Sequence, residues 1–273
     1  MRVQGYNILS SLNSLSKNIK NSSESIGKVS SGKRINRASD DAAGLCISES
    51  FKSQVRGLSQ AERNIQDGVS MLQVADGAMG EITDCLHRMK ELSVKGANGT
   101  LINKDKEMVD SEFQQLKKGI DDIASNTEFN TIKLLNENKD VSIQTKDRPY
   151  TTYMINLFDV STNSLRISDA SVSNYENAQD SISKIDNALE NITSHRVSIG
   201  ADSNSLQHAY NDTSNSNYNL TASLSRIEDI NMATYIMKFT KDNVITQYSE
   251  MIATSSKQNA ESANALLNKW FNT

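Results

Sequence analysis

The sequence predicts a mainly α-helical protein: a long antiparallel coiled-coil rod with one small β-hairpin. Aromatic residues make up 5 % of the 273 residues, and there are 12 glycines and a single proline, Pro149. Many short elements joined by turns normally need more glycine and proline than this. Apolar residues also recur at spacings of three and four over most of the chain, which is the heptad pattern of packed helices. Few turns and sustained heptads together indicate few, long helices.

A heptad stripe near the N-terminus predicts a first helix that ends at Ser31-Gly32. Its apolar members are Ile8, Leu12, Leu15, Ile19, Ile26 and Val29. Residues 33–39 have no periodicity, which predicts an extended connector. Ser39, Asp40 and Asp41 then offer capping side chains and negative charge where a helix N-terminus leaves amides unpaired. A second helix is therefore expected over residues 42–97.

The second helix carries a long apolar stripe, which predicts that it is the central element of the rod. The stripe consists of Leu58, Ala61, Ile65, Gly68, Leu72, Ala75, Met79, Ile82, Leu86 and Met89. A third helix is expected to fold back on it through Val109, Phe113, Leu116, Ile120 and Ile123. Alternation replaces this rhythm at Val141, which predicts a β-hairpin within about residues 140–168 that turns at Pro149. Leu165 and Ile167 could form a further strand.

Helical spacing resumes at Ala178 and keeps its register to Ile227, so a fourth long helix is expected to cover the hairpin of helices two and three. The register slips near Asp229, after which a weaker stripe predicts a last helix. That stripe consists of Ile230, Met237, Val244 and Met251. We therefore expect a rod domain at 40–228 and a discontinuous domain at 1–39 and 229–273. The rod leaves both end stripes uncovered, and polymerisation with copies of the chain would cover them.

The remaining composition predicts no enzyme, cofactor or metal site. The three histidines have no metal-ligand spacing, and no glycine loop has the spacing that cradles phosphate. The net charge of −4 comes from interspersed acids and bases, so neither nucleic acid nor a membrane is an expected partner. Cys46 and Cys85 fall on one expected helix, roughly 58 Å apart at helical rise, too far for a disulfide. We expect both to be small core thiols.

Five segments carry motifs of a known family. They are VSSGKRINRASDDAAGLCIS at 29–48, RNIQDGVSMLQVADGAM at 63–79, RMKELSVKGANGT at 88–100, TEFNTIKLL at 127–135 and SLSRIEDINMATYIMKFTKDNVITQ at 223–247. Together they resemble bacterial flagellins. The resemblance implies a short flagellin that lacks the outer domains of longer members. It implies a structural subunit that self-assembles into the extracellular flagellar filament for motility, after export in unfolded form through the flagellar type III channel.

The resemblance also implies how the chain is used. The two end helices would form the inner tube of the filament, with the stripe Ile8 to Val29 packing against the stripe Ile230 to Met251. Expected partners are other copies of the chain, an export chaperone, and the cap and hook-associated proteins. Alternatives are the hook-filament junction protein, which typically has proline where this chain has Ala42, and a minor flagellin variant. A coiled-coil adaptor would explain the heptads but not the β-hairpin.

Arg88, Leu92 and Glu112 match the family positions through which many flagellins contact the innate-immune Toll-like receptor for flagellin. Arg88 and Glu112 are expected on adjacent antiparallel helices, where they would form one charged patch. The alternative is that these residues form a solvated or lateral-packing face.

Overall fold

The protein is mainly α-helical, as predicted, with a small antiparallel hairpin. The structure, a computed structural model, describes residues 2–271, apart from the side chains of residues 2–8, 11, 264 and 266–271. Its helices are α1 (Arg2–Ser31), α2 (Ala42–Gly96), α3 (Asn103–Asn126), α4 (Tyr175–Glu228) and α5 (Met232–Phe271). Its strands are β1 (Glu128–Phe129), β2 (Ile132–Lys133), β3 (Lys139–Gln144) and β4 (Thr152–Leu157).

The chain forms two compact units. One contains residues 54–219, and the other contains the residues up to Ser53 together with those from Leu220 onward. The domain boundaries expected from the sequence, at 39–40 and 228–229, both lie inside the second of these units. They stay predictions about how the assembled protein is divided.

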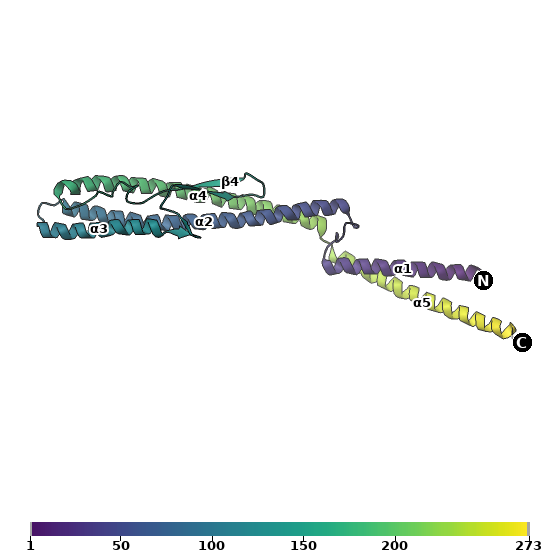
Figure 1. The fold of residues 1–273 in the computed structure, drawn as a ribbon. Helices are drawn as coiled ribbons and strands as arrows, with labels where there is room; N and C mark the ends of the chain where they lie inside the picture. Colours follow the sequence, from purple (N-terminus) through teal and green to yellow (C-terminus); the bar gives the residue numbers. More distant parts are fainter. Residues whose placement is uncertain (1, 272–273) are drawn as a thin grey trace. The chain divides into compact units, whose positions relative to one another are not determined.

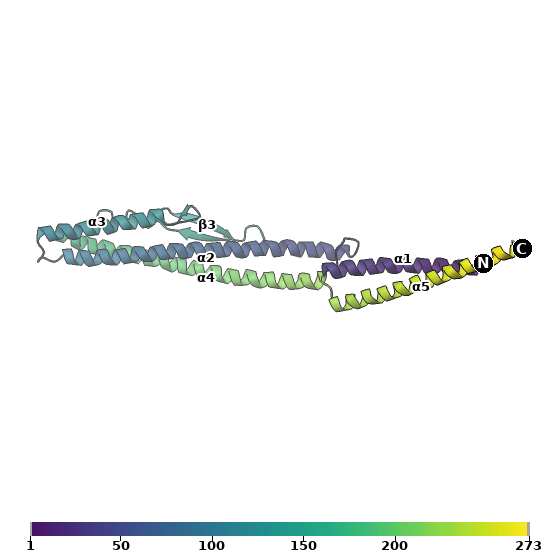
Figure 2. The same cartoon turned by 90° about the horizontal axis from the view of Figure 1, so that it is seen from below.

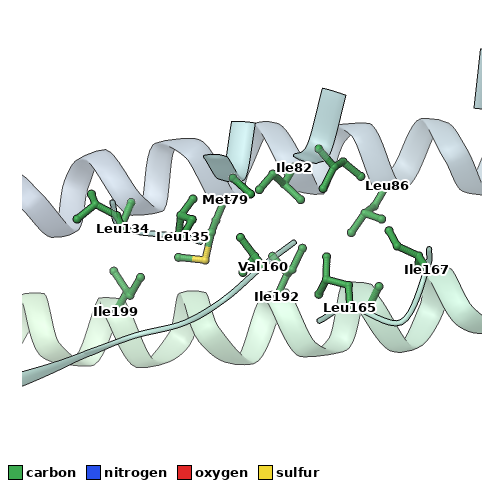
Figure 3. Packing of buried hydrophobic residues seen from close by; sticks show 14 of the residues in the cluster. Met79, Ile82, Leu86, Leu134, Leu135, Val160, Leu165, Ile167, Ile192 and Ile199 are labelled. Carbon is green, nitrogen blue, oxygen red and sulfur yellow. The ribbon is translucent and has the colours of Figure 1, made fainter. Parts of the chain in front are cut away.

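The unit of residues 54–219 is built on the apolar stripe of α2. In Figures 1 and 2, α2, α3 and α4 lie side by side over this unit. Every predicted stripe residue of α2 is buried, and Met79, Ile82 and Leu86 have no exposed surface. Figure 3 shows these side chains facing Ile192 and Ile199 of α4. The heptad spacing thus brings the two stripes into one core, because residues three and four apart share a helix face.

Helix α3 closes one side of this core and anchors the irregular segment that follows β4. Its Val109, Phe113, Ile120 and Ala124 are buried. Asp110 accepts a hydrogen bond from the Val172 amide at 2.7 Å, and Asp121 accepts two from Thr162 at 2.9 Å. These carboxylates satisfy backbone and hydroxyl groups that a partly buried loop would otherwise leave unpaired.

The expected further strand at Leu165 and Ile167 was wrong. Both residues are buried, but they lie in a compact turn in which the Leu165 amide donates to Ser161 O at 3.0 Å and the Ile167 amide to Thr162 O at 2.9 Å. In Figure 3 their side chains point into the space between α2 and α4. Alternating apolar residues served core packing here rather than a strand ladder, a distinction that periodicity over three residues does not make.

The predicted β-hairpin is confirmed as the antiparallel pair β3–β4, with Val141 opposite Ile155 and Ile143 opposite Tyr153. Ile155 and Leu157 are buried, so the alternation faces one side to the core as expected. A second pair, β1–β2, was missed because each strand has only two residues. Its turn residues, Asn130 and Thr131, have φ of 48° and 67°, the left-handed conformation of a tight hairpin turn.

The expectation of two core thiols was wrong for Cys46. Cys85 is half-buried and packs against the main core, and burial is the first cause that raises its pKa. Cys46 is exposed, because the covered face of α2 near its start passes through Leu45 and Ser48. Cys46 is rotated by about 100° from Leu45 around the helix axis and therefore lies outside the covered face.

Two glycines of α2 give a matched test of the core. A Cβ on Gly68 would overlap Ile143 Cδ1 and lie 3.3 Å from Leu206 Cδ1, whereas a Cβ on Gly77 would have no neighbour within 4 Å. We expect Gly77→Ala to raise the free energy of unfolding by about 0.5–1 kcal/mol, the usual helix gain over glycine. Gly68→Ala should lower it by about 1–3 kcal/mol through overpacking. Urea unfolding of both variants checks this, and an equal gain at both positions would contradict the packing described here.

Candidate assembly site

The α1–α2 connector and the link between α4 and α5 meet in one short antiparallel bridge, in which Lys33 pairs with Asp229. The Arg34 amide donates to Glu228 O at 2.6 Å, and the Ile230 amide donates to Gly32 O at 3.2 Å. Gly32 has φ of +69°, the left-handed conformation that ends a helix and that glycine adopts at little cost. The bridge therefore joins the end of α1 to the start of α5.

An ion cluster of the buried Glu228 with the half-exposed Lys33 and the partly exposed Lys52 lies beside this bridge. Glu228 is 4 % exposed, and its Oε1 accepts hydrogen bonds from Lys52 Nζ at 2.8 Å and Lys33 Nζ at 2.9 Å. Lys52 also pairs at 2.9 Å with Glu49, whose side chain is 62 % exposed. Burial alone raises the pKa of the Glu228 carboxyl, but the bonds from Lys52 and Lys33 outweigh it and hold that pKa below 4.5. The bond to Glu228 raises the pKa of Lys52.

The expected extended connector is instead folded tightly around Asp40. Oδ2 of Asp40 accepts the amides of Asn36 at 3.1 Å and Arg37 at 3.0 Å, and these bonds lower the pKa of Asp40. Asp40 also pairs with Lys28 of α1 at 3.4 Å. Asp41 caps α2 as predicted, since its Oδ1 accepts the Gly44 amide at 2.9 Å. Acidic side chains thus bend this segment, and the predicted extended conformation is wrong, because lack of periodicity does not distinguish an extended segment from a folded one.

Ile35 is the apolar anchor of the connector, and sequence reasoning missed it. Its side chain is 1 % exposed and lies against the first turn of α2. A Cβ on Gly44 would come within 2.7 Å of Ile35 Cδ1, so glycine allows this close approach. The available signal was a single large aliphatic residue among the polar residues 33–40.

Helices α1 and α5 pack against each other, side by side where they meet the connector (Figures 1 and 2). The buried or half-buried side chains of α1 are Leu15, Asn18, Asn21, Ser22, Ser25, Lys28 and Val29 among those described. Those of α5 are Tyr235, Phe239, Asp242, Thr246, Ser249, Ala253, Ser256, Ala260 and Ala263. Both sets follow the three-four spacing of a contact face, and most members are small or polar. The contact within one chain therefore buries little of the large aliphatic surface.

Most of the predicted filament-core residues lie outside this contact. The exposed fractions are 48 % for Leu12, 49 % for Ile19, 51 % for Ile26, 65 % for Met237, 59 % for Val244 and 68 % for Met251. Leu15, Val29 and Ile230 are half-buried, and the side chain of Ile8 lies outside those described. The two predicted stripes thus do not pack against each other within one chain. One edge of the α1 stripe contacts α5, and the other edge stays uncovered.

The structure pairs Arg88 with Glu112 across α2 and α3. Arg88 donates to Glu112 Oε1 through Nε at 3.0 Å and Nη2 at 2.7 Å, and to Glu91 through Nη1 at 2.9 Å. The bond to Glu112 is the first cause that raises the pKa of Arg88. Half of each side chain remains exposed, whereas Leu92 is 2 % exposed and belongs to the core. The charged pair is a surface feature, and Leu92 lies beneath it.

Comparisons with known proteins define the class. The model for the bacterial flagellin N-terminal helical region matches residues 5–140, and that for the C-terminal helical region matches residues 182–266. A flagellin of Halalkalibacterium halodurans is 37 % identical over 92 % of this chain and 93 % of its own. A flagellin of Bacillus subtilis is 35 % identical over 95 % of this chain and 97 % of its own.

A solved structure agrees with these relatives. The crystal structure of Bacillus cereus flagellin is 34 % identical, covers 55 % of this chain and 88 % of its own, and has a TM-score of 0.51. In the part of the chain that the structure describes, no helix is both long and apolar enough to cross a membrane.

These matches span both ends of the chain and most of its length. The chain belongs to the bacterial flagellin family, which confirms the resemblance found in the sequence. It is a structural subunit of the bacterial flagellar filament and is located outside the cell in the flagellum. Motility and flagellar export follow from this membership. The hook-filament junction alternative is not favoured.

The ion cluster predicts an acid-sensitive connector. Because the folded pKa of Glu228 lies below its unfolded value, its stabilisation is present above that value and is lost as pH falls through the folded pKa. Lys52 has a raised folded pKa, so its contribution is lost only as pH rises through that alkaline value. We expect Glu228→Gln to reduce the loss of stability that the wild type shows as pH falls. Circular dichroism of unfolding at a series of pH values measures this. Glu49→Gln, which removes an exposed carboxylate, should keep that loss, and identical profiles would contradict the role of Glu228.

Proposed function

We propose that this flagellin polymerises through the uncovered apolar edges of α1 and α5, which together form the inner wall of the filament. The observation that carries the proposal is the inverted pattern of the end-helix pair. Small and polar residues make up most of the α1–α5 contact, while Leu12, Ile19 and Ile26 point away from it on α1. Met237, Val244 and Met251 do the same on α5.

An amphipathic helix normally turns its large aliphatic side chains toward its partner. Leaving them outside is costly in an isolated chain, since each buried aliphatic side chain contributes about 1.5–3 kcal/mol. A neighbouring copy offers the same edges, so each added subunit covers one set and exposes another. Such a head-to-tail contact does not close on itself and continues as a helical polymer. This chemistry supports a second copy of the chain as the partner.

Further partners follow from the family resemblance. The same uncovered edges would need shielding before assembly, which favours an export chaperone that binds an end helix. Cap and hook-associated proteins would then contact the ends of the polymer. The proposal assigns the chain no catalysis, cofactor or metal.

We also propose that the Arg88–Glu112 pair contacts the Toll-like receptor for flagellin in hosts that have it. Support comes from the exposure of the pair on the α2–α3 surface and from its geometry, in which two N–H groups of Arg88 donate to one oxygen, Oε1 of Glu112. Leu92 would support α2 from the core instead of touching the receptor.

Assembly is tested by placing a carboxylate on the uncovered edge of α5. Val244→Asp should abolish salt-induced or seeded polymerisation, because an unpaired charge would be buried between subunits. Helicity and stability of the monomer should stay unchanged, since Val244 is 59 % exposed. Asn243→Asp adds the same charge at a neighbouring exposed position off the stripe and should still polymerise. Electron microscopy and sedimentation read out both, and normal filaments from Val244→Asp would refute the proposed inner wall.

Receptor contact is tested separately with cells that report Toll-like receptor signalling. Arg88→Ala should lower the signal about tenfold or more, because it removes the central positive charge from the contact. Arg63→Ala is the control, since Arg63 is exposed on the same helix and hydrogen-bonds only to Gln60 among the contacts described. An inactive wild-type protein, or equal signals from both variants, would reject this contact.

A further inference from the structure

Glu228 is the most deeply buried charged side chain among the described residues. Its contacts come from three segments that are distant in the sequence. Lys33 reaches it from the α1–α2 connector and Lys52 from α2, while Glu228 itself ends α4. Packing of the apolar edges in a filament core does not require a buried carboxylate here, so the role of Glu228 must be a different one.

We propose that Glu228 is a positioning residue that fixes the register at which α1 and α5 leave the connector. The register set in this way decides which edge of each end helix is left uncovered for assembly. The positioning role rests on the geometry of the connector, and only its consequence for polymerisation rests on the proposed function.

Hydrogen bonds also fix the backbone around Glu228. The guanidinium of Arg34 donates to Ile227 O through Nη2 at 2.8 Å and Nε at 3.2 Å, and the Arg34 amide donates to Glu228 O at 2.6 Å. The last carbonyls of a helix have no partner within it, so Arg34 satisfies the C-terminal end of α4. Arg34 also lies 3.7 Å from Asp41, the cap of α2.

This arrangement controls the register of the end helices because the bridge is adjacent to both. Gly32 directly follows α1, and the bridged Asp229 and Ile230 precede α5, which begins at Met232. A slip of one residue in the bridge would turn a helix by about 100° against its partner. Ile26 would then replace Ser25 in the contact, and the uncovered edge would be lost. Small residues in the α1–α5 contact, such as Ser25 and Ser249, offer little resistance to such a slip.

A charge suits this task better than an apolar side chain. Burying a carboxylate is costly unless its partners reach it, and in this register both lysine Nζ atoms lie within 3 Å of Oε1. Apolar contacts are less directional and would tolerate neighbouring registers. Fixing register is the best-attested use of buried polar groups between helices.

The test compares Glu228→Gln with Glu49→Gln in the full chain at neutral pH. Both variants remove one carboxylate that binds Lys52, but Glu49 is exposed and makes no contact with the bridge among the contacts described. Hydrogen–deuterium exchange is measured at the amides of Arg34 and Ile230, which form the bridge. Glu228→Gln should speed their exchange about tenfold or more, while amides around Phe113 stay protected. Glu49→Gln should match the wild type.

A second variant, Lys52→Gln, tests whether the two residues act as one unit. Combining it with Glu228→Gln should add little to the exchange seen with Glu228→Gln alone, because both remove the same interaction. Full additivity would show independent effects and would overturn the cluster as a unit.

Polymerisation of the same variants completes the test. We expect Glu228→Gln to give fewer or shorter filaments than Glu49→Gln while monomer helicity stays the same. Unchanged exchange at the bridge, or faster exchange everywhere, would overturn the positioning role. Faster exchange with normal filaments would overturn its consequence for assembly. A wild-type chain that forms no filaments would count against the proposed function alone, because the exchange data still decide the role of Glu228.

Discussion

The unit of residues 54–219 depends on burial of the apolar stripe of α2. That stripe faces α4 across side chains such as Met79 and Ile192, neither of which has exposed surface. Helix α3, the hairpin β3–β4 and the turn at Leu165 cover what α4 does not. Their positions follow from the need to remove this stripe from water, since α2 alone could not sustain so long an amphipathic helix. Carboxylates such as Asp121 then satisfy the backbone of the covering segments.

The end helices follow the opposite rule. Where α1 packs on α5, small and polar side chains such as Ser25 and Ser249 are covered, while Ile26 and Met251 remain in solvent. Such a pair has little reason to form by hydrophobic burial alone. Its geometry is set where the helices begin and end, by the bridge from Gly32 to Ile230 and the ions around Glu228. A subunit whose apolar edges face outward is suited to a polymer, and this agrees with its membership of the flagellin family.

Polar groups thus have different roles in the two units. In residues 54–219, polar positions within the apolar rhythm of α4 are accommodated by specific bonds, such as Thr213 to Thr145 O at 3.1 Å and Arg196 to Asp76 at 2.8 Å. These bonds allow polar residues beside a core that is held by apolar contacts. Around the connector, charged groups supply most of the contacts, and Ile35 is the main apolar contact. Conditions that weaken charges should therefore affect the connector before the core.

Heptad spacing in the sequence determined where the helices lie and that α2 is central, because that pattern is local and repeats many times. Alternation of apolar residues on either side of one turn determined that β3 pairs with β4. The motifs at both ends identified the family, because each motif is a continuous run of residues. Only the tertiary structure decided that Leu165 sits in a turn, that Ile35 is buried, and that one edge of the α1 stripe faces α5 while Ile26 does not. The apolar stripe of α1 has two edges along the helix, and the residues of both edges recur with the same heptad spacing. That spacing therefore does not show which edge contacts α5. The choice between them comes from contacts nearly two hundred residues apart in the sequence, such as Arg34 with Ile227, which no local pattern encodes.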